Sequence, residues 1–164
     1  MIDDLSIRLV KEEDLDDLAK LYLKVYTHFD VREKWDFDSA YKLVSYWFKR
    51  QPDLCFLSEL KGKIVGGFVA GIKPWCDGNH LVDGEMFVDP DYQKKGIGSE
   101  LSKVMYRTAL EKYDAKIFDA ITFSKKEHPL KWYKRQGFRE VKEWTIISGD
   151  LREILENLDK QKHL

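Results

Sequence analysis

Apolar residues recur along the chain with two different periods, which predict a succession of strands and helices. Residues 5–10 alternate apolar and polar positions, as expected for a strand with one buried face. Residues 15–26 and 38–50 repeat their apolar positions every three or four residues and are predicted to be helices. Asp38 or Ser39 is expected to cap the second helix.

The rest of the chain continues this mixture of periods. The predicted elements are strands over 54–60 and 64–72 joined by a tight turn at 61–63, a loop around 74–79, a strand over 80–88, a helix over 98–113, a strand over 117–123, a short helix over 129–136 ended by Gly137, strand-like residues 138–148 and a polar amphipathic tail from Asp150. Strands that precede, interleave with and follow helices predict a mixed α/β (α+β) fold. A length of 164 residues predicts a single domain over 1–164.

Composition and charge narrow the function classes. The chain is 43% hydrophobic with a formal net charge of −1, which is typical of a globular protein and argues against a general electrostatic grip on nucleic acid. It contains no apolar run long enough to span a membrane. The N-terminus does not resemble a signal peptide, and Cys55 and Cys76 lack CxxC or metal-ligand spacing. We therefore expect a cytoplasmic protein without a disulfide or a structural metal.

The segment after the strand at 80–88 carries the most specific chemistry. The strand runs into Asp89-Pro90, and Gln93-Lys94-Lys95-Gly96-Ile97-Gly98 then opens directly into a helix. Glycines let the backbone approach a ligand, and the free N–H groups of a first helical turn attract anions. The loop therefore predicts a phosphate site, although a simple turn with two glycines would fit the same residues. It matches neither the Walker A loop nor GxGxxG.

Two motifs together resemble one known family. Val88-x-Pro90-x-x-Gln93-x-x-Gly96-x-Gly98 resembles the acetyl-CoA loop of the GNAT superfamily of N-acetyltransferases, and Trp132-Tyr133-Lys134-Arg135-Gln136-Gly137-Phe138 resembles its second signature. The resemblance implies a mostly antiparallel sheet flanked by helices and an enzyme that uses acetyl-CoA as cosubstrate.

The resemblance also implies roles for individual residues. In such enzymes the loop binds the pyrophosphate of coenzyme A, the preceding strand binds the pantetheine arm, and the tyrosine equivalent to Tyr133 protonates the leaving thiolate. The implied cofactor-binding residues are Met86, Phe87, Val88, Gln93, Lys94, Lys95, Gly96, Ile97, Gly98 and Ser99. Lys126 stands where many members carry an asparagine that contacts the cofactor.

Glu85 is the first candidate for a general base. It lies three residues before Val88 on the strand that would flank the thioester, and an attacking amine must lose a proton. An exposed carboxylate or a salt-bridge partner is the alternative interpretation. For Tyr133 the alternative is a core tyrosine. His80 is expected to be a solvated residue at the start of its strand.

The acceptor site is the least defined part of the prediction. Aromatic residues gather between and near the first two helices (Tyr26, His28, Phe29, Trp35 and Trp47), where they could bind an amine or pack in the core. Asp30, Glu33, Asp36 and Asp38 could attract a cation or form a solvated acidic face.

These observations predict an N-acetyltransferase that moves an acetyl group from acetyl-CoA to a primary amine by direct transfer in a ternary complex. A small-molecule acceptor is preferred over a peptide. The alternatives are a protein or peptide N-acetyltransferase, a non-catalytic acyl-CoA-binding regulatory module, and a nucleotide-binding fold unrelated to coenzyme A. A homodimer formed through the C-terminal strands is a further possibility that the sequence does not decide.

Overall fold

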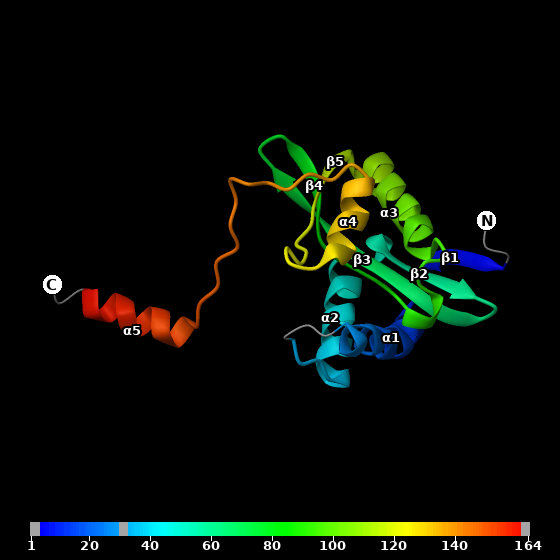
Figure 1. Cartoon of the computed structure of the whole chain (residues 1–164), viewed down its shortest axis with the longest axis horizontal. Coiled ribbons are helices and arrows are strands. Elements are labelled where there is room, and N and C mark those ends of the chain that lie inside the picture. The colour runs from blue at the N-terminus through cyan, green and yellow to red at the C-terminus, as the bar shows by residue number, and fades with distance from the viewer. Residues whose placement is uncertain (1–3, 30–32, 162–164) are drawn as a thin grey trace. The chain divides into compact units, whose positions relative to one another are not determined.

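The computed structural model describes residues 4–29 and 33–161. The chain forms two compact units, divided after Ile121. The first unit contains a five-stranded sheet in the order β1 to β5 (Figure 1), with β1 Leu5–Leu9, β2 Cys55–Leu60, β3 Lys63–Trp75, β4 Gly78–Val88 and β5 Ala115–Asp119. The first four strands pair antiparallel and β5 is parallel to β4. This mixed, mostly antiparallel sheet confirms the predicted fold class.

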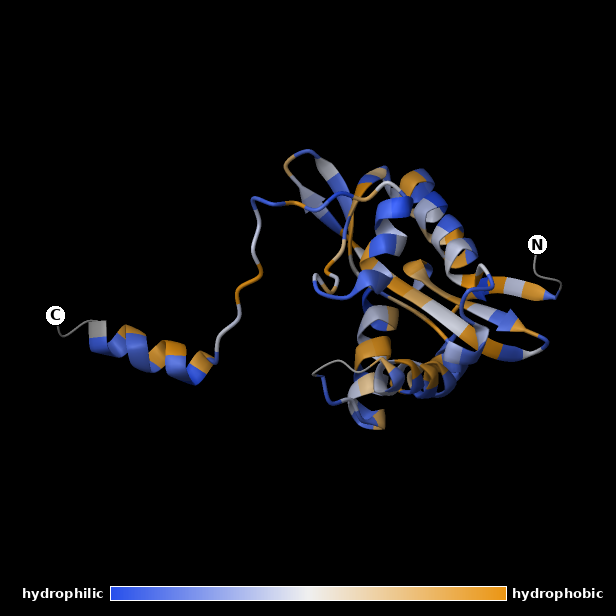
Figure 2. Ribbon diagram, viewed as in Figure 1, coloured by the Kyte–Doolittle hydropathy of each residue, from blue (hydrophilic) through white to orange (hydrophobic). Residues whose placement is uncertain are grey.

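Helices cover both faces of the sheet. α1 (Leu15–His28) and α2 (Phe37–Arg50) lie on one face and α3 (Ile97–Tyr113) lies on the other (Figure 1). Alternate strand residues point to opposite faces, so Leu57 and Val69 pack with α1 and α2, whereas Phe56 and Phe68 pack with α3. The strands consequently carry apolar residues on both faces, and orange segments lie along the central strands in Figure 2.

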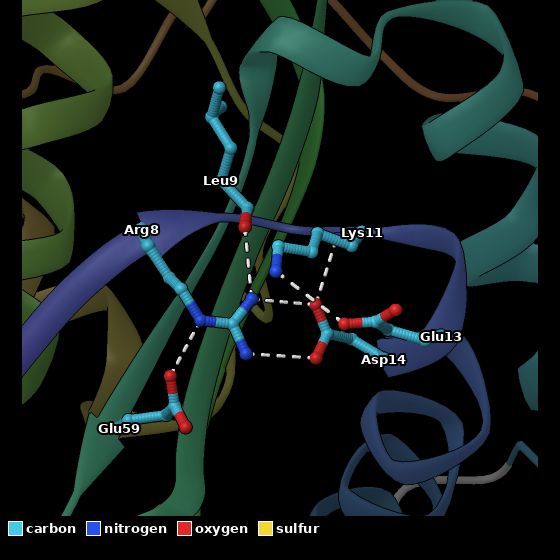
Figure 3. A network of polar contacts seen from close by, with 6 residues as sticks. All are labelled: Arg8, Leu9, Lys11, Glu13, Asp14 and Glu59. Atoms are coloured by element: carbon cyan, nitrogen blue, oxygen red, sulfur yellow. Dashed lines mark hydrogen bonds and ion pairs between the residues drawn. The ribbon is translucent and has the colours of Figure 1, made fainter.

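A partly buried network of ion pairs connects β1 with its neighbours (Figure 3). Arg8 on β1 donates to Glu59 Oε2 on β2 at 2.6 Å and to both carboxylate oxygens of Asp14 at 2.6 and 2.9 Å. Asp14 ends the short 3-10 helix η1 (Glu12–Asp14) that precedes α1. The fork geometry of the guanidinium suits two carboxylates, so one side chain fixes β1 against both β2 and the start of α1.

Two predicted boundaries in this unit differ from the structure. The cap of α2 is Asp36, which accepts a hydrogen bond from the Ser39 amide at 2.8 Å, and the prediction of Asp38 or Ser39 is wrong. β3 continues to Trp75 through the predicted loop, because Pro74 and Trp75 pair with Asn79 and Gly78 of β4. Pairing with β4 thus makes Pro74 and Trp75 part of a strand, although their composition is typical of a loop.

The second unit contains α4 (Glu127–Arg135) and α5 (Leu151–Gln161). The predicted strand over 138–148 is wrong: these residues form no ladder with any described strand. An alternating pattern makes a strand only when a partner supplies backbone hydrogen bonds. Trp144 and Ile147 are 68% and 88% exposed. The strand predicted to Phe123 likewise ends at Asp119.

Candidate active site

The sheet opens beside β4, between its middle and its C-terminal end. Pairing of β4 with β5 ends at Val82 and Asp119, whereas pairing with β3 continues to Val88. Beyond Val82, β4 therefore has no strand partner on the β5 side among the described residues. Half of the strand presents an unpaired edge.

Backbone alternation decides which groups this open edge offers. The Asp89 amide donates to the Val65 carbonyl at 2.9 Å, which sets the phase of the ladder with β3. In an antiparallel pair the hydrogen-bonding direction alternates, so Glu85 and Phe87 also face β3. Met86 and Val88 direct their N–H and C=O groups to the open side. The Phe87 ring is buried and packs edge-on against Tyr22 with centroids 5.2 Å apart.

A bulge in β4 sets the orientation of Glu85. Val69 pairs with Glu85 and Gly71 pairs with Val82, so Asp83 and Gly84 together lie opposite one residue of β3. Bulges re-aim side chains, and they are common beside active sites. Gly84 is required there because an added Cβ would lie 2.9 Å from Phe68 Cε2 and 3.1 Å from the Val69 carbonyl.

Two tyrosines of α1 bind the Glu85 carboxylate. Tyr26 Oη donates to Glu85 Oε2 at 2.8 Å, and Tyr22 Oη lies 3.4 Å from the same oxygen. Their rings are stacked with centroids 4.3 Å apart. Burial, and then the charge of Glu85, raise the pKa of both hydroxyls, so both stay protonated donors. Glu85 is thus a part-buried carboxylate in a defined hydrogen-bond network.

The aromatic residues predicted for the acceptor site have different environments. Trp35 packs edge-on against Tyr22 at 5.1 Å and lies 6.1 Å from Tyr26. Trp47 is 5% exposed and belongs to the core between the helices and the sheet. Among these residues, therefore, Tyr26 contacts Glu85 and Trp35 packs on the tyrosine pair, whereas core packing accounts for Trp47.

Asp89 anchors the start of the predicted phosphate loop. Its carboxylate is buried, and it accepts hydrogen bonds from Lys24 Nζ at 2.6 Å and the Asp91 amide at 3.1 Å, with Lys63 Nζ at 3.4 Å. Burial opposes its ionisation, but the lysines and the amide outweigh burial and lower its pKa. The short helix η3 (Pro90–Tyr92) begins directly after it. The exit from β4 is therefore fixed by α1 and β3.

The loop then turns into the N-terminus of α3. Lys94 and Gly96 adopt positive φ values of 60° and 89°, and the Gly96 carbonyl accepts the first intrahelical bond, from Glu100, at 3.1 Å. The N–H groups of Ile97, Gly98 and Ser99 precede that bond and have no intrahelical acceptor. The Gln93 side chain contacts the end of β4, because its Nε2 donates to the Val88 carbonyl at 3.0 Å. An exposed backbone turn with free donors fits a phosphate group.

Two lysines, Lys95 of the loop and Lys63 of β3, lie close to the ring of Tyr92. Lys95 Nζ and Lys63 Nζ each lie 4.9 Å from the centroid of Tyr92, and Lys95 also donates to the Asp91 carbonyl at 3.3 Å. Cation–π contact holds both ammonium groups near the loop. Their positive charge complements an anion bound at the N-terminus of α3.

Tyr133 belongs to the second unit, on α4, where the Tyr-x-x-x-Gly-Phe signature forms a helix C-cap. Gly137 has φ of 99°, its amide donates to the Lys134 carbonyl at 3.1 Å, and the Phe138 amide donates to the Tyr133 carbonyl at 3.3 Å. This is the Schellman arrangement, which places Phe138 against Tyr133 with centroids 5.1 Å apart. The signature therefore fixes the backbone and ring of Tyr133. Lys126 precedes α4 as its N-cap residue.

His80 does not have the solvated position predicted for it. It is 6% exposed, with Nδ1 2.6 Å from Asp119 Oδ2 and Nε2 2.8 Å from Asp77 Oδ1. Both ring nitrogens thus meet carboxylates because the β3–β4 turn and the end of β5 converge on β4. This cluster lies where β5 leaves β4.

Several site residues escaped prediction. Tyr22 carried a local signal, since it stands four residues before Tyr26 on the same helix face. Lys24 carried none, because its partner Asp89 is 65 residues away. In the described part of the chain, histidine, cysteine and carboxylate side chains form no group of three suited to a metal ion. No helix found there is long and apolar enough to cross a bilayer.

Comparison with known proteins identifies the family. The model of the acetyltransferase (GNAT) family matches residues 15–138, which include both motifs and extend over both units. The chain belongs to the GNAT acetyltransferase family. An uncharacterized N-acetyltransferase of Methanocaldococcus jannaschii is 34% identical over 91% of this chain. The sequence-based prediction of an acyltransferase is thereby confirmed at the level of the family.

Solved structures agree with the fold of this GNAT chain. A possible acetyltransferase from Clostridium difficile superposes with a TM-score of 0.75 at 16% identity, covering 91% of this chain and 99% of that one. A predicted acetyltransferase with acetyl-CoA from Clostridium acetobutylicum gives 0.70 at 16% identity, covering 88% and 96%. The chain spans 66% of the length of the Methanocaldococcus relative.

Proposed function

We propose that this chain is an N-acetyltransferase that moves an acetyl group from acetyl-CoA to the primary amine of a small molecule by direct transfer in a ternary complex. The observation that carries the proposal is the open edge of β4, which runs without interruption from Glu85 into the loop and the N-terminus of α3. A carboxylate, an unpaired strand edge and an anion site therefore follow one another along a single stretch of chain.

The residues of this stretch suit coenzyme A. The free amides of Ile97, Gly98 and Ser99 would bind the pyrophosphate, helped by Lys94 and Lys95. Met86 and Val88 would pair their backbone groups with the amides of the pantetheine arm, as a strand does. When bound, acetyl-CoA supplies an activated acyl group as a thioester.

Glu85 is the proposed base and Tyr133 the proposed acid. An amine near pKa 10 is mostly protonated at neutral pH, so Glu85 would accept the ammonium proton, directly or through water, as the amine attacks. A C–N bond forms and the thioester C–S bond breaks. Tyr133 would give a proton to the departing thiolate, and the second proton that the nitrogen loses on becoming an amide would restore the phenol, so the ammonium proton is the one released. Acid–base help of this kind contributes about 10²–10⁴-fold, and orientation of amine and thioester adds the rest.

Calorimetric titration with acetyl-CoA, with ATP and NAD as controls, tests the cofactor site. Micromolar binding of acetyl-CoA alone, about −8 kcal/mol, is expected. A free-thiol assay over a panel of amines then tests transfer. Tyr133→Phe should lower kcat with little change in acetyl-CoA affinity. Binding without turnover on any amine would instead indicate a non-catalytic coenzyme A module, and a preference for ATP or NAD would refute the cofactor assignment.

A further inference from the structure

Glu33 places a second carboxylate beside the tyrosine pair that contacts Glu85. Glu33 Oε2 accepts a hydrogen bond from Trp35 Nε1 at 2.9 Å, and the Trp35 ring packs against both tyrosines. Burial and the charge of Glu85 are the main causes of the raised pKa of Tyr22 and Tyr26, and the charge of Glu33 adds to them. Two carboxylates therefore act on one group of three aromatic rings.

The structure distinguishes Glu33 from the other acidic residues of this region. Asp36 is used as the cap of α2, and Asp38 lies in the first turn of α2, where the helix dipole favours a negative charge. Asp30 lies outside the described residues. Glu33 is exposed to solvent, and within the described part of the chain it forms no ion pair with a lysine, arginine or histidine.

This arrangement favours a cationic ligand over any other. The charges of Glu33 and Glu85 both act on Tyr22 and Tyr26, so the electrostatic potential around this pair is negative and favours a cation. Aromatic faces attract ammonium groups, and tryptophan attracts them most strongly. An anionic acceptor would be repelled by both glutamates. A cation with one charged group could satisfy only one of them.

We propose that the acceptor is a small aliphatic diamine or polyamine, whose reacting amine faces Glu85 and whose second ammonium group binds Glu33 and the ring of Trp35. This inference rests on the proposed acetyl transfer at Glu85. The second ammonium would donate a charge-assisted hydrogen bond to Glu33. Glu33 is then a specificity-determining residue, and it takes no part in proton transfer.

Binding of two matched amines to the full chain tests this inference without turnover. Calorimetry in the presence of coenzyme A, which carries no acetyl group, compares 1,4-diaminobutane with n-butylamine. An exposed ion pair with a cation–π contact predicts a preference of about tenfold for the diamine, which weakens as salt is raised. Glu33→Gln should lower the preference to the part that the cation–π contact supplies, and Trp35→Phe should reduce it because the Nε1 donor is lost.

A control and a second readout separate the outcomes. Glu111→Gln removes an equally exposed carboxylate on α3 and should leave the preference intact. Equal binding of the two amines, or a preference of unchanged size in Glu33→Gln, overturns the inference. Thiol release with n-butylamine as readily as with the diamine would also overturn it while supporting acetyl transfer. Glu33-dependent diamine binding with no thiol release from any amine would support the site and contradict the proposed transfer.

Discussion

Tyr26 Oη lies 2.8 Å from Glu85 Oε2, so a hydroxyl of α1 holds the carboxylate that β4 presents beside its open edge. The two residues are 59 positions apart in sequence and meet because α1 packs across the sheet at this point. A hydrogen bond to the charged form of a carboxylate favours that form. The tyrosine therefore positions the Glu85 carboxylate at the open edge.

Tyr26→Phe should consequently leave Glu85 less well positioned as a base without unfolding the chain. The ring stays in its stack, and only the phenol donor is lost. We expect the acid limb of the kcat/KM profile to move to higher pH, and the loss of positioning to lower activity at neutral pH about tenfold or more, since one hydrogen bond to a charged group contributes about 1.5–3 kcal/mol. Tyr46→Phe on α2, whose hydroxyl contacts only Arg50 among the described residues, is the matched control. An unchanged profile would contradict the positioning role.

Gly84→Ala should distort the bulge that orients Glu85. The new methyl group would lie 3.1 Å from the Val69 carbonyl and closer still to the Phe68 ring, and neither can move freely within the sheet. We expect a loss of about 1–3 kcal/mol in the free energy of unfolding, measured in urea, together with a lower kcat. A variant with wild-type stability and activity would show that the bulge tolerates a side chain.

The His80 cluster should make stability depend on pH. The hydrogen bond that His80 donates to Asp119 raises the pKa of His80, burial opposes this, and Asp77 adds to the increase. A raised pKa means that the imidazolium stabilises the fold. Its contribution is complete below the unfolded value of 6.5 and is lost as pH rises through the higher folded value. Urea midpoints should fall with increasing pH above 6.5.

The His80→Gln variant provides the control for that titration. Glutamine keeps hydrogen-bonding capacity but does not titrate, so its midpoints should stay level over the same range of pH. A fall of equal size in the variant would assign the pH dependence to other groups.

Gly137→Ala should disturb Tyr133 through the backbone. The left-handed conformation at Gly137 costs a residue with a side chain about 1–2 kcal/mol, and the Schellman cap would weaken. We expect reduced kcat with unchanged acetyl-CoA affinity, because the loop at α3 belongs to another part of the chain. Gly137→Asn is the matched variant, since asparagine tolerates this conformation better and should retain more activity.

The loop and the helices were predictable where their determinants are local. Short-range hydrogen bonds determine the turn at Gly96, the start of α3 and the C-cap at Gly137. The residues that form these bonds all lie within the two sequence motifs or next to them. The sheet faces also follow from the hydrophobic period of the strands.

Long-range contacts could not be predicted in this way. His80 is hydrogen-bonded to Asp119, and Asp89 is anchored by Lys24, and no local period predicts either contact. The strand predicted over 138–148 is an error of another kind: the residues have a strand-like pattern, but they form no ladder. Family resemblance suggested the role of the loop, whereas Glu33 became distinct from the other acidic residues only through its contact with Trp35.

The open edge of β4 has a consequence for the lifetime of the protein. A sheet with a gap beside one of its central strands is a weak point, where heat or a protease would begin to open it. If the pantetheine arm fills the gap, acetyl-CoA acts as part of the folded structure, and a concentration of 100 times Kd adds about 2.7 kcal/mol to stability. We therefore expect the melting temperature and protease resistance to increase with acetyl-CoA, so that a cell's acetyl-CoA supply would determine how long the protein survives.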